Sequence, residues 1–148
     1  TAIRGKLLTI FGVSKSHTAA ILTGSGTLAV EAMLSSYGAP DRKVLVLSNG
    51  VYGERLAAIL SAHNLPHSVL SVPLGSFPSP AEITAALDQD PSIRAVALVH
   101  HETSSGMLNP LEETVRLARR RGKAASGKNS TPDAGLIGVW CAPCWDRG

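Results

Sequence analysis

Short apolar runs alternate with helix-like segments along most of this chain, from about residue 18 to residue 122. The segments between the runs place apolar residues at helical spacing, as Leu56, Ile59 and Leu60 do. Strands separated by helices in this way form parallel sheets, so the sequence predicts an α/β fold, a mostly parallel sheet with flanking helices. We expect strands at residues 19–22, 44–47, 69–72 and 95–99, and helices at residues 27–36 and 53–62, after Ser79 and after Asn109.

Two of these helices have marked starts. Ser79 and Glu82 have the spacing of a capping box, with Pro80 at the first helical position, where its missing N–H is not needed. Asn109 stands before another proline, which predicts a second capped start. We expect the last helix to end at Gly122.

Residues 123–148 differ in composition from the chain before them. A parallel sheet calls for another apolar strand here, but residues 123–133 have many turn formers and no β-branched run. The only later apolar run is residues 136–139. We therefore expect the tail to be irregular or weakly packed.

The composition is that of a globular domain, with 148 residues, 44% hydrophobic and 17% charged. No apolar run approaches the ~20 residues that span a bilayer, and no signal-cleavage site follows the short run at residues 7–11, so we expect a cytoplasmic protein that does not enter membranes. The net charge is only +3, and the basic residues 119–121 lie at a predicted helix end, where cations complement the helix dipole. We therefore expect no nucleic-acid surface. Because the chain starts at Thr1 inside a helix-like pattern, we expect further sequence upstream.

A glycine-rich turn, Gly24-Ser25-Gly26-Thr27, lies between a predicted strand and a predicted helix. Backbone N–H groups and the positive end of a helix dipole converge at such a turn, which suits a phosphate, and the hydroxyls of Ser25 and Thr27 add donors. On these residues alone, a tight strand-to-helix turn explains the pattern equally well. The dinucleotide-binding fingerprint does not apply, because its third glycine is absent.

Two other groups of residues are weaker candidates. His100, His101 and Glu102 follow a predicted strand, but adjacent histidines point in different directions and no third ligand has metal-site spacing, so we expect no metal site. Cys141 and Cys144 have the spacing of a thioredoxin motif, yet only four residues follow Cys144 and no helix can lower the thiol pKa there. We therefore do not expect redox chemistry.

Three segments together resemble the class V aminotransferases that depend on pyridoxal phosphate (PLP), in the subfamily whose amino donor is 2-aminoethylphosphonate. The segments are residues 22–32 (LTGSGTLAVEA), residues 44–55 with SNGVYGER at their end, and residues 99–111 (VHHETSSGMLNPL). They occur in the order and approximate spacing of that family. The resemblance covers residues 3–122 and implies part of the large domain of the fold-type I PLP enzymes.

The resemblance implies a cofactor site and a reaction. Ser25, Gly26 and Thr27 would hold the PLP phosphate, Tyr52 would stack on the pyridine ring, and Thr103 would lie beside the ring. Family members move an amino group from a donor to a keto acid, here from 2-aminoethylphosphonate to pyruvate, and the full-length proteins form homodimers. Other members of the class use serine or alanine with glyoxylate or pyruvate.

The sequence departs from the family after residue 122. Asp133 follows no apolar strand, so it does not match the family's aspartate at the pyridine nitrogen, and Lys128 lacks the context of the family's cofactor-binding lysine. A disrupted reading frame after Arg121 or Gly122 would explain the change. We expect residues 1–122 to form a partial PLP-binding domain without catalytic residues, and residues 123–148 to be a non-matching tail. A non-catalytic phosphate-binding domain is the rival interpretation from another class.

Overall fold

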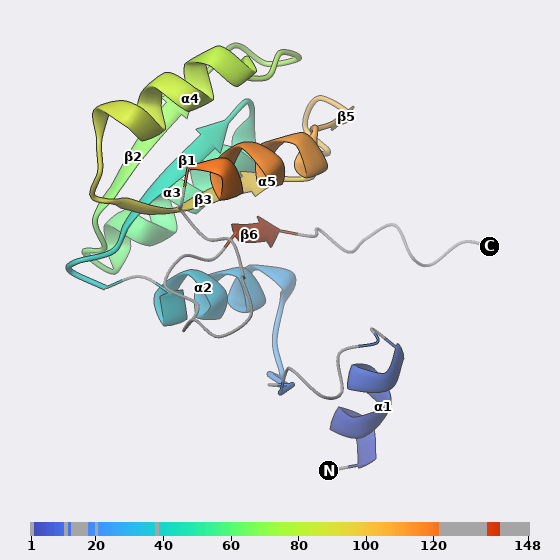
Figure 1. Ribbon diagram of the computed structural model, residues 1–148. Coiled ribbons are helices and arrows are strands. Elements are labelled where there is room, and N and C mark those ends of the chain that lie inside the picture. Colours follow the sequence, from blue (N-terminus) through green and yellow to red (C-terminus); the bar gives the residue numbers. More distant parts are fainter. Residues whose placement is uncertain are drawn as a thin grey trace.

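The computed structural model describes residues 2–10, 12, 18–19, 21–37, 39–121 and 136–139. Its centre is a four-stranded parallel sheet in the order β2-β1-β3-β6 (Figure 1). The predicted α/β fold is therefore confirmed. The strands of this sheet are β1 (Lys43–Ser48), β2 (His67–Ser71), β3 (Ile93–Val99) and β6 (Leu136–Val139); β4 (His101–Glu102) and β5 (Met107–Leu108) form a short antiparallel hairpin; the helices are α1 (Ala2–Ile10), α2 (Gly26–Tyr37), α3 (Val51–Ala62), α4 (Pro80–Gln89) and α5 (Leu111–Arg120).

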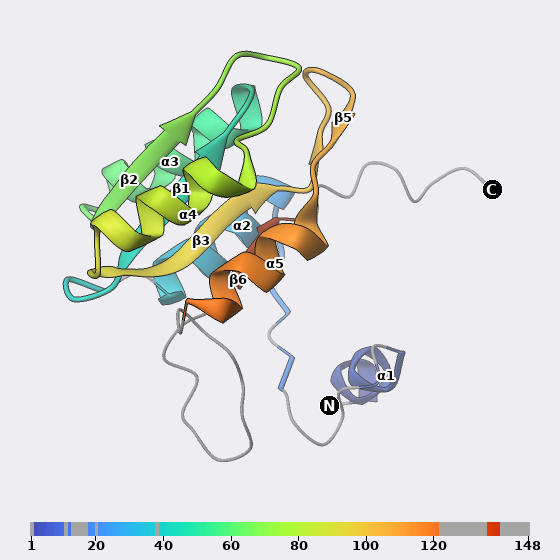
Figure 2. The same ribbon diagram turned by 45° about the horizontal axis from the view of Figure 1, so that its top comes forward.

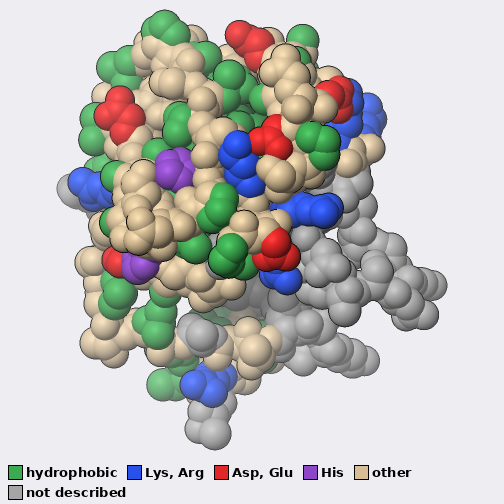
Figure 3. Space-filling view, turned by 90° about the vertical axis from the view of Figure 1, so that its left-hand side faces the viewer, with side chains coloured by type: hydrophobic (Ala, Val, Ile, Leu, Met, Phe, Trp, Pro, Cys, Tyr) green, Lys and Arg blue, Asp and Glu red, His purple; other side chains and the backbone are tan. Residues whose placement is uncertain are grey.

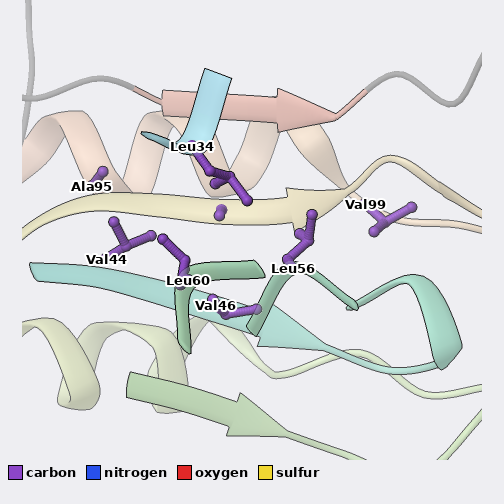
Figure 4. Packing of buried hydrophobic residues seen from close by; sticks show 8 residues of the cluster. Leu34, Val44, Val46, Leu56, Leu60, Ala95 and Val99 are labelled. Carbon is purple, nitrogen blue, oxygen red and sulfur yellow. The ribbon is translucent and has the colours of Figure 1, made fainter. Parts of the chain in front are cut away.

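Helices cover both faces of the sheet. Successive side chains of a strand point to opposite faces, and because these side chains are apolar, both faces must be buried. Val44 and Val46 of β1 pack with Leu56 and Leu60 of α3 and with Leu34 of α2 (Figure 4). The intervening strand residues Leu45 and Leu47 face α4 and α5 on the other side. Figure 2 shows the two layers with the sheet between them. Strands buried on both faces explain why β1 and β3 are almost wholly apolar.

The capping box at α4 is confirmed. The Ser79 hydroxyl accepts the Glu82 N–H at 3.3 Å, and the Glu82 carboxylate accepts the Ser79 N–H at 2.8 Å. The hydroxyl of Ser79 also donates to this carboxylate, and these bonds lower the pKa of Glu82 below its usual value. The start of α4 is therefore set by local sequence.

The predicted cap at Asn109 is wrong. Pro110 occupies the N-cap position of α5, and no side chain caps this helix. The Asn109 side chain donates instead to the carbonyl oxygen of Val99 at 2.7 Å. A buried partner outside the helix therefore competes successfully with the local capping bond.

Two strand expectations are also wrong. Residues 19 and 21–22 form no strand; Ile21 and Leu22 are 49% and 56% exposed, and no described strand pairs with them. A short apolar run becomes a strand only where a neighbour can complete its ladder. The reverse holds at residues 136–139, which we expected to be irregular: β6 finds the open edge of β3 and pairs with Val96–Val99 in parallel. The rest of the tail lies outside the described residues.

Helix α1 confirms the helix-like pattern at the start of the chain but has no buried residue. It stands apart from the layers in both ribbon views (Figures 1 and 2). Its apolar side chains include the exposed Ile3 and Ile10. None of the helices in the described ranges is long and apolar enough to cross a membrane.

Ion pairs lie at the end of the sheet where the strands begin. Lys43, at the start of β1, donates to Asp90 at 2.6 Å, just before β3, and Arg121 pairs with Asp88 of α4 at 2.5 Å. Figure 3 looks at this side and shows basic and acidic side chains interspersed. The hydrogen bond from Lys43 and those from Ser92 lower the pKa of Asp90 to about 2.

The Lys43–Asp90 pair should make stability depend on pH in the acid range. Because the folded-state pKa of Asp90 lies below the unfolded value of ~3.9, the pair stabilises the fold above that value, and the contribution is lost as pH falls toward 2. The Lys43→Met variant should therefore lose less stability than the unaltered chain between pH 4 and pH 2. Urea unfolding at several pH values measures this difference in the free energy of unfolding. The control is Glu112→Gln, which breaks the exposed pair of Glu112 with Arg116 in α5. Equal pH dependence in the unaltered chain and Lys43→Met would contradict the assignment.

Candidate active site at the carboxyl edge of the sheet

The sheet has a topological switch point between β1 and β3. The connection after β1 runs through α3 to β2 on one side, whereas the connection after β3 runs through α5 to β6 on the other. Connections that leave two adjacent strands in opposite directions open a crevice at the carboxyl ends of these strands, where open α/β sheets bind their ligands. The start of α3 and the β4–β5 hairpin lie at this edge, and both carry segments predicted from the sequence to form the site.

A buried pair of amide side chains joins the ends of β1 and β3. Asn49 and Asn109 exchange two hydrogen bonds, at 2.8 and 3.1 Å. Asn49 also donates to the carbonyl oxygen of Ser76, before α4, and Asn109 to that of Val99. Both side chains are almost fully buried, so these bonds replace the water that the amides lose. The pair holds three segments together at the carboxyl edge of the sheet.

Helix α3 begins at Val51, two residues before the predicted start. Its N-cap, Gly50, has no side chain, and the free N–H groups of Tyr52 and Gly53 point instead to the carboxylate of Glu102, at 3.4 and 3.2 Å. Glu102 belongs to β4 and is fully buried. A carboxylate is favourable at the positive end of a helix, so this contact ties the start of α3 to the hairpin that follows β3.

The predicted phosphate turn opens helix α2. Gly26 is the first residue of the helix, and the Ser25 hydroxyl accepts the Leu28 N–H at 3.2 Å as an N-cap. Ser25, Gly26 and Thr27 are all exposed. Helix geometry leaves the N–H groups of Gly26 and Thr27, which precede the one that Ser25 accepts, without an acceptor within the helix, and such groups can bind an anion. No strand precedes this turn in the described residues, so its geometry comes from the helix start alone.

Arg55 links two of the predicted site residues. Its guanidinium donates to the Thr27 hydroxyl at 3.5 Å and lies 5.5 Å from the centre of the Tyr52 ring. Thr27 belongs to α2 and Tyr52 to the first turn of α3, so the starts of these helices are neighbours. The Tyr52 ring is half-buried and packs against the core cluster below it. A cation over an aromatic face restrains the ring.

Thr103 lies in the exposed turn between β4 and β5. Its connection to Tyr52 runs through the preceding residue, Glu102, whose carboxylate accepts the Tyr52 N–H. The structure thus brings Thr27 and Tyr52 to a common neighbour and joins the Thr103 turn to the same helix start. Gly106, at φ 71°, closes the turn in the left-handed region that favours glycine.

Sequence reasoning missed four residues that shape this edge. The sequence predicts a helix cap at Asn109 and a weak metal candidate at Glu102, and it gives Asn49 and Arg55 no role beyond the motif at residues 44–55. In the described part of the chain, no group of three His, Cys, Asp or Glu side chains could hold a metal ion. A signal for Glu102 existed: an isolated acidic residue between a buried strand and small polar residues calls for a partner.

No described lysine lies at the carboxyl edge. Lys43 begins β1 at the opposite end of the sheet and pairs with Asp90, and Lys6 belongs to α1. Lys128, Asp133, Cys141 and Cys144 lie outside the described residues. Among the described residues, the edge therefore offers a helix start, an aromatic ring and hydroxyls, but no lysine amine.

The chain is similar to several known proteins. The 2-aminoethylphosphonate–pyruvate transaminase of Vibrio cholerae is 38% identical over 143 residues, which cover 93% of this chain and 39% of the relative. The transaminase of the same name from Pseudomonas aeruginosa is 46% identical over 118 residues, or 80% of this chain and 32% of the relative. The chain thus spans well under half of these relatives' length. No family model matches the chain.

The solved structures that resemble this chain are aminotransferases, as the sequence relatives are. Pyridoxamine–pyruvate aminotransferase from Mesorhizobium loti matches with a TM-score of 0.73 and 27% identity, covering 93% of this chain and 32% of that one. Alanine–glyoxylate aminotransferase from Nostoc matches with a TM-score of 0.72 and 29% identity, over 92% and 33% of the two chains. The chain therefore belongs, over the part of their length that it spans, to the class V pyridoxal-phosphate aminotransferases of fold type I.

Proposed function

We propose that the carboxyl edge binds PLP, with Ser25, Gly26 and Thr27 at its phosphate and Tyr52 and Thr103 at its ring. The observation that carries this proposal is the meeting of the α2 and α3 starts through Arg55, which lies between Thr27 and Tyr52. An anion site and an aromatic ring then lie side by side at the switch point of the sheet. A bare phosphate-binding domain needs the first of these features and has no use for the second.

The donor set fits the cofactor's two ends. The first turn of α2 offers N–H groups, hydroxyls and the helix dipole to a dianionic phosphate. The Tyr52 ring, which packs on the core and has the Arg55 guanidinium 5.5 Å from its centre, would supply the aromatic side chain that stacks on a planar ring. When bound, PLP would supply an electron sink for the carbon atom that carries the transferred amino group.

For the whole protein, we propose amino transfer from 2-aminoethylphosphonate to pyruvate, following the names of the relatives. Serine or alanine as donor, with glyoxylate or pyruvate as acceptor, is the alternative within the class, which the name of the Nostoc structure supports. We also propose a cytoplasmic homodimer. Exposed Ile3 and Ile10 on α1 support a partner surface at this helix.

The 148-residue chain should bind PLP weakly and catalyse no transamination. The described part of the proposed site has a helix start for the phosphate and the Tyr52 ring, but it has no lysine. It could therefore orient the cofactor without supplying the amine or base that the reaction needs. Incubation with 2-aminoethylphosphonate and pyruvate should form no alanine, and borohydride should fix no PLP on a single lysine. Alanine formation together with stoichiometric labelling of one lysine would overturn this expectation.

Two serines that cap helices provide a matched test of the proposed phosphate site at residues 25–27. Ser25 and Ser79 each accept an N–H three residues later, at 3.2 and 3.3 Å, so replacing either by alanine should cost about 1 kcal/mol of stability. Only Ser25→Ala should weaken PLP binding, by roughly tenfold, because a hydrogen bond to a charged group is worth ~1.5–3 kcal/mol. Equal PLP affinity in the two variants would contradict a phosphate site at the start of α2. Inorganic phosphate competing as well as PLP, with no effect of Tyr52→Leu, would favour the phosphate-binding alternative.

A further inference from the structure

The Glu102 carboxylate stands at the junction of the two segments assigned to the cofactor ring. It is fully buried and accepts hydrogen bonds from the N–H groups of Tyr52 and Gly53 on α3. From its own side it accepts the Ser104 N–H at 3.4 Å and the Ser104 hydroxyl at 2.5 Å. One oxygen, Oε1, serves both Tyr52 and Ser104, so the carboxylate fixes the two segments to each other.

A local residue would stabilise the α3 start with less cost. Serine, threonine or aspartate at the N-cap satisfies these N–H groups without burying a charge, whereas a buried carboxylate is costly unless it is fully hydrogen-bonded. Position 50 is nevertheless a glycine. A β-carbon there would lie 2.6 Å from Cδ of Glu102 and 2.7 Å from the Ser104 hydroxyl. The local cap is thus absent, and its space is taken by a residue about fifty positions away.

A remote cap does something that a local cap cannot do. It makes the position of Tyr52 depend on the hairpin that carries Thr103, and it makes the position of this hairpin depend on the start of α3. The Ser104 hydroxyl strengthens the connection, because it donates to Glu102 while it accepts the Val51 N–H at 3.4 Å. The two residues assigned to the cofactor ring lie on different elements, Tyr52 in α3 after β1 and Thr103 in the β4–β5 turn after β3, so their spacing depends on such a link.

We propose that Glu102 is a positioning residue, which holds Tyr52 and Thr103 at the spacing that a bound pyridine ring requires. This inference rests on the proposed PLP site. Glu102 does not touch the cofactor; it acts through the backbone of α3 and of the hairpin. Its loss should therefore affect cofactor affinity more than the loss of the exposed capping-box carboxylate at the start of α4.

Glu82 provides this control, because its carboxylate also accepts N–H and hydroxyl bonds at a helix start, that of α4. Without PLP, Glu102→Gln should speed amide hydrogen exchange roughly tenfold at Tyr52, Gly53 and Ser104 together, whereas Glu82→Gln should act only near Ser79. Unchanged exchange at Tyr52 and Ser104 contradicts the link. If Glu102→Gln fails to fold, Ser104→Ala keeps the charge and removes only the hydroxyl, and it should raise exchange at Val51 and Tyr52 severalfold.

The second arm measures the PLP dissociation constant under conditions in which every variant is folded. Glu102→Gln, or Ser104→Ala in its place, should weaken binding by about tenfold or severalfold respectively, and Glu82→Gln should leave it unchanged. Equal affinity of the Glu102 variant and the unaltered chain overturns the inference while the proposed site stands. Absence of PLP binding by the unaltered chain contradicts the proposed function itself, and the inference falls with it.

Discussion

Replacing Asn109 by alanine should lower the free energy of unfolding by about 3 kcal/mol, because it leaves two buried polar groups without partners. Asn49 loses the donor to its side-chain oxygen, and the Val99 carbonyl loses the bond at 2.7 Å. The melting temperature should fall by roughly 10 °C in a domain of this size. Thermal and urea unfolding measure both quantities.

The matched control for Asn109→Ala is Gln89→Ala, which removes an exposed amide at the end of α4 and should change stability by less than ~0.5 kcal/mol. The Asn49→Ala,Asn109→Ala double variant should be less unstable than the sum of its single variants, since each single change already breaks the pair. Additive losses, or a loss below ~1 kcal/mol for Asn109→Ala, would show that the amide pair does not hold this edge together.

Replacing Gly53 by alanine should lower the free energy of unfolding by about 2 kcal/mol, although alanine favours helices by up to ~1 kcal/mol. A β-carbon at this position would lie 2.7 Å from Oγ and 2.8 Å from Cα of Ser48, at the end of β1. The Ser48 hydroxyl has no hydrogen-bond partner among the described residues and can rotate away. The backbone atom cannot, so α3 and β1 must separate.

The control for Gly53→Ala is Gly5→Ala in α1, where a β-carbon meets nothing within 4 Å. This change should be neutral or slightly stabilising. Because Tyr52 precedes Gly53, the separation of α3 from β1 should also weaken PLP binding. Equal stability of the two glycine variants would contradict the close packing of α3 on β1.

The alternation of strands and helices could be predicted because its signals are local. Apolar runs that are buried on both faces mark β1 and β3, and the Ser79–Glu82 capping box marks the start of α4. Errors arose where a distant partner decides the structure. Residues 136–139 became a strand through the open edge of β3, and Asn109 left its expected cap for a buried pair with Asn49.

The candidate site could be located from sequence only through its resemblance to a family. Ser25 and Thr27 were chosen from a local motif, and the structure does place them at a helix start. Arg55 and Glu102 act across elements that are far apart in the sequence, so no local pattern reveals their contacts. The predicted strand before the phosphate turn failed for the same reason, because strand formation needs a partner that the run itself does not show.

The most direct test of the proposed site is a map of the backbone amide NMR shifts that PLP changes in the 148-residue chain. We expect the largest changes at residues 25–28, at Tyr52 and Gly53, and at residues 103–105, where helix starts and hairpin meet at the switch point. Residues 79–82, at the equally well capped start of α4, should not change. PLP binding that leaves residues 25–28 unchanged, or that centres on α4, would contradict the account.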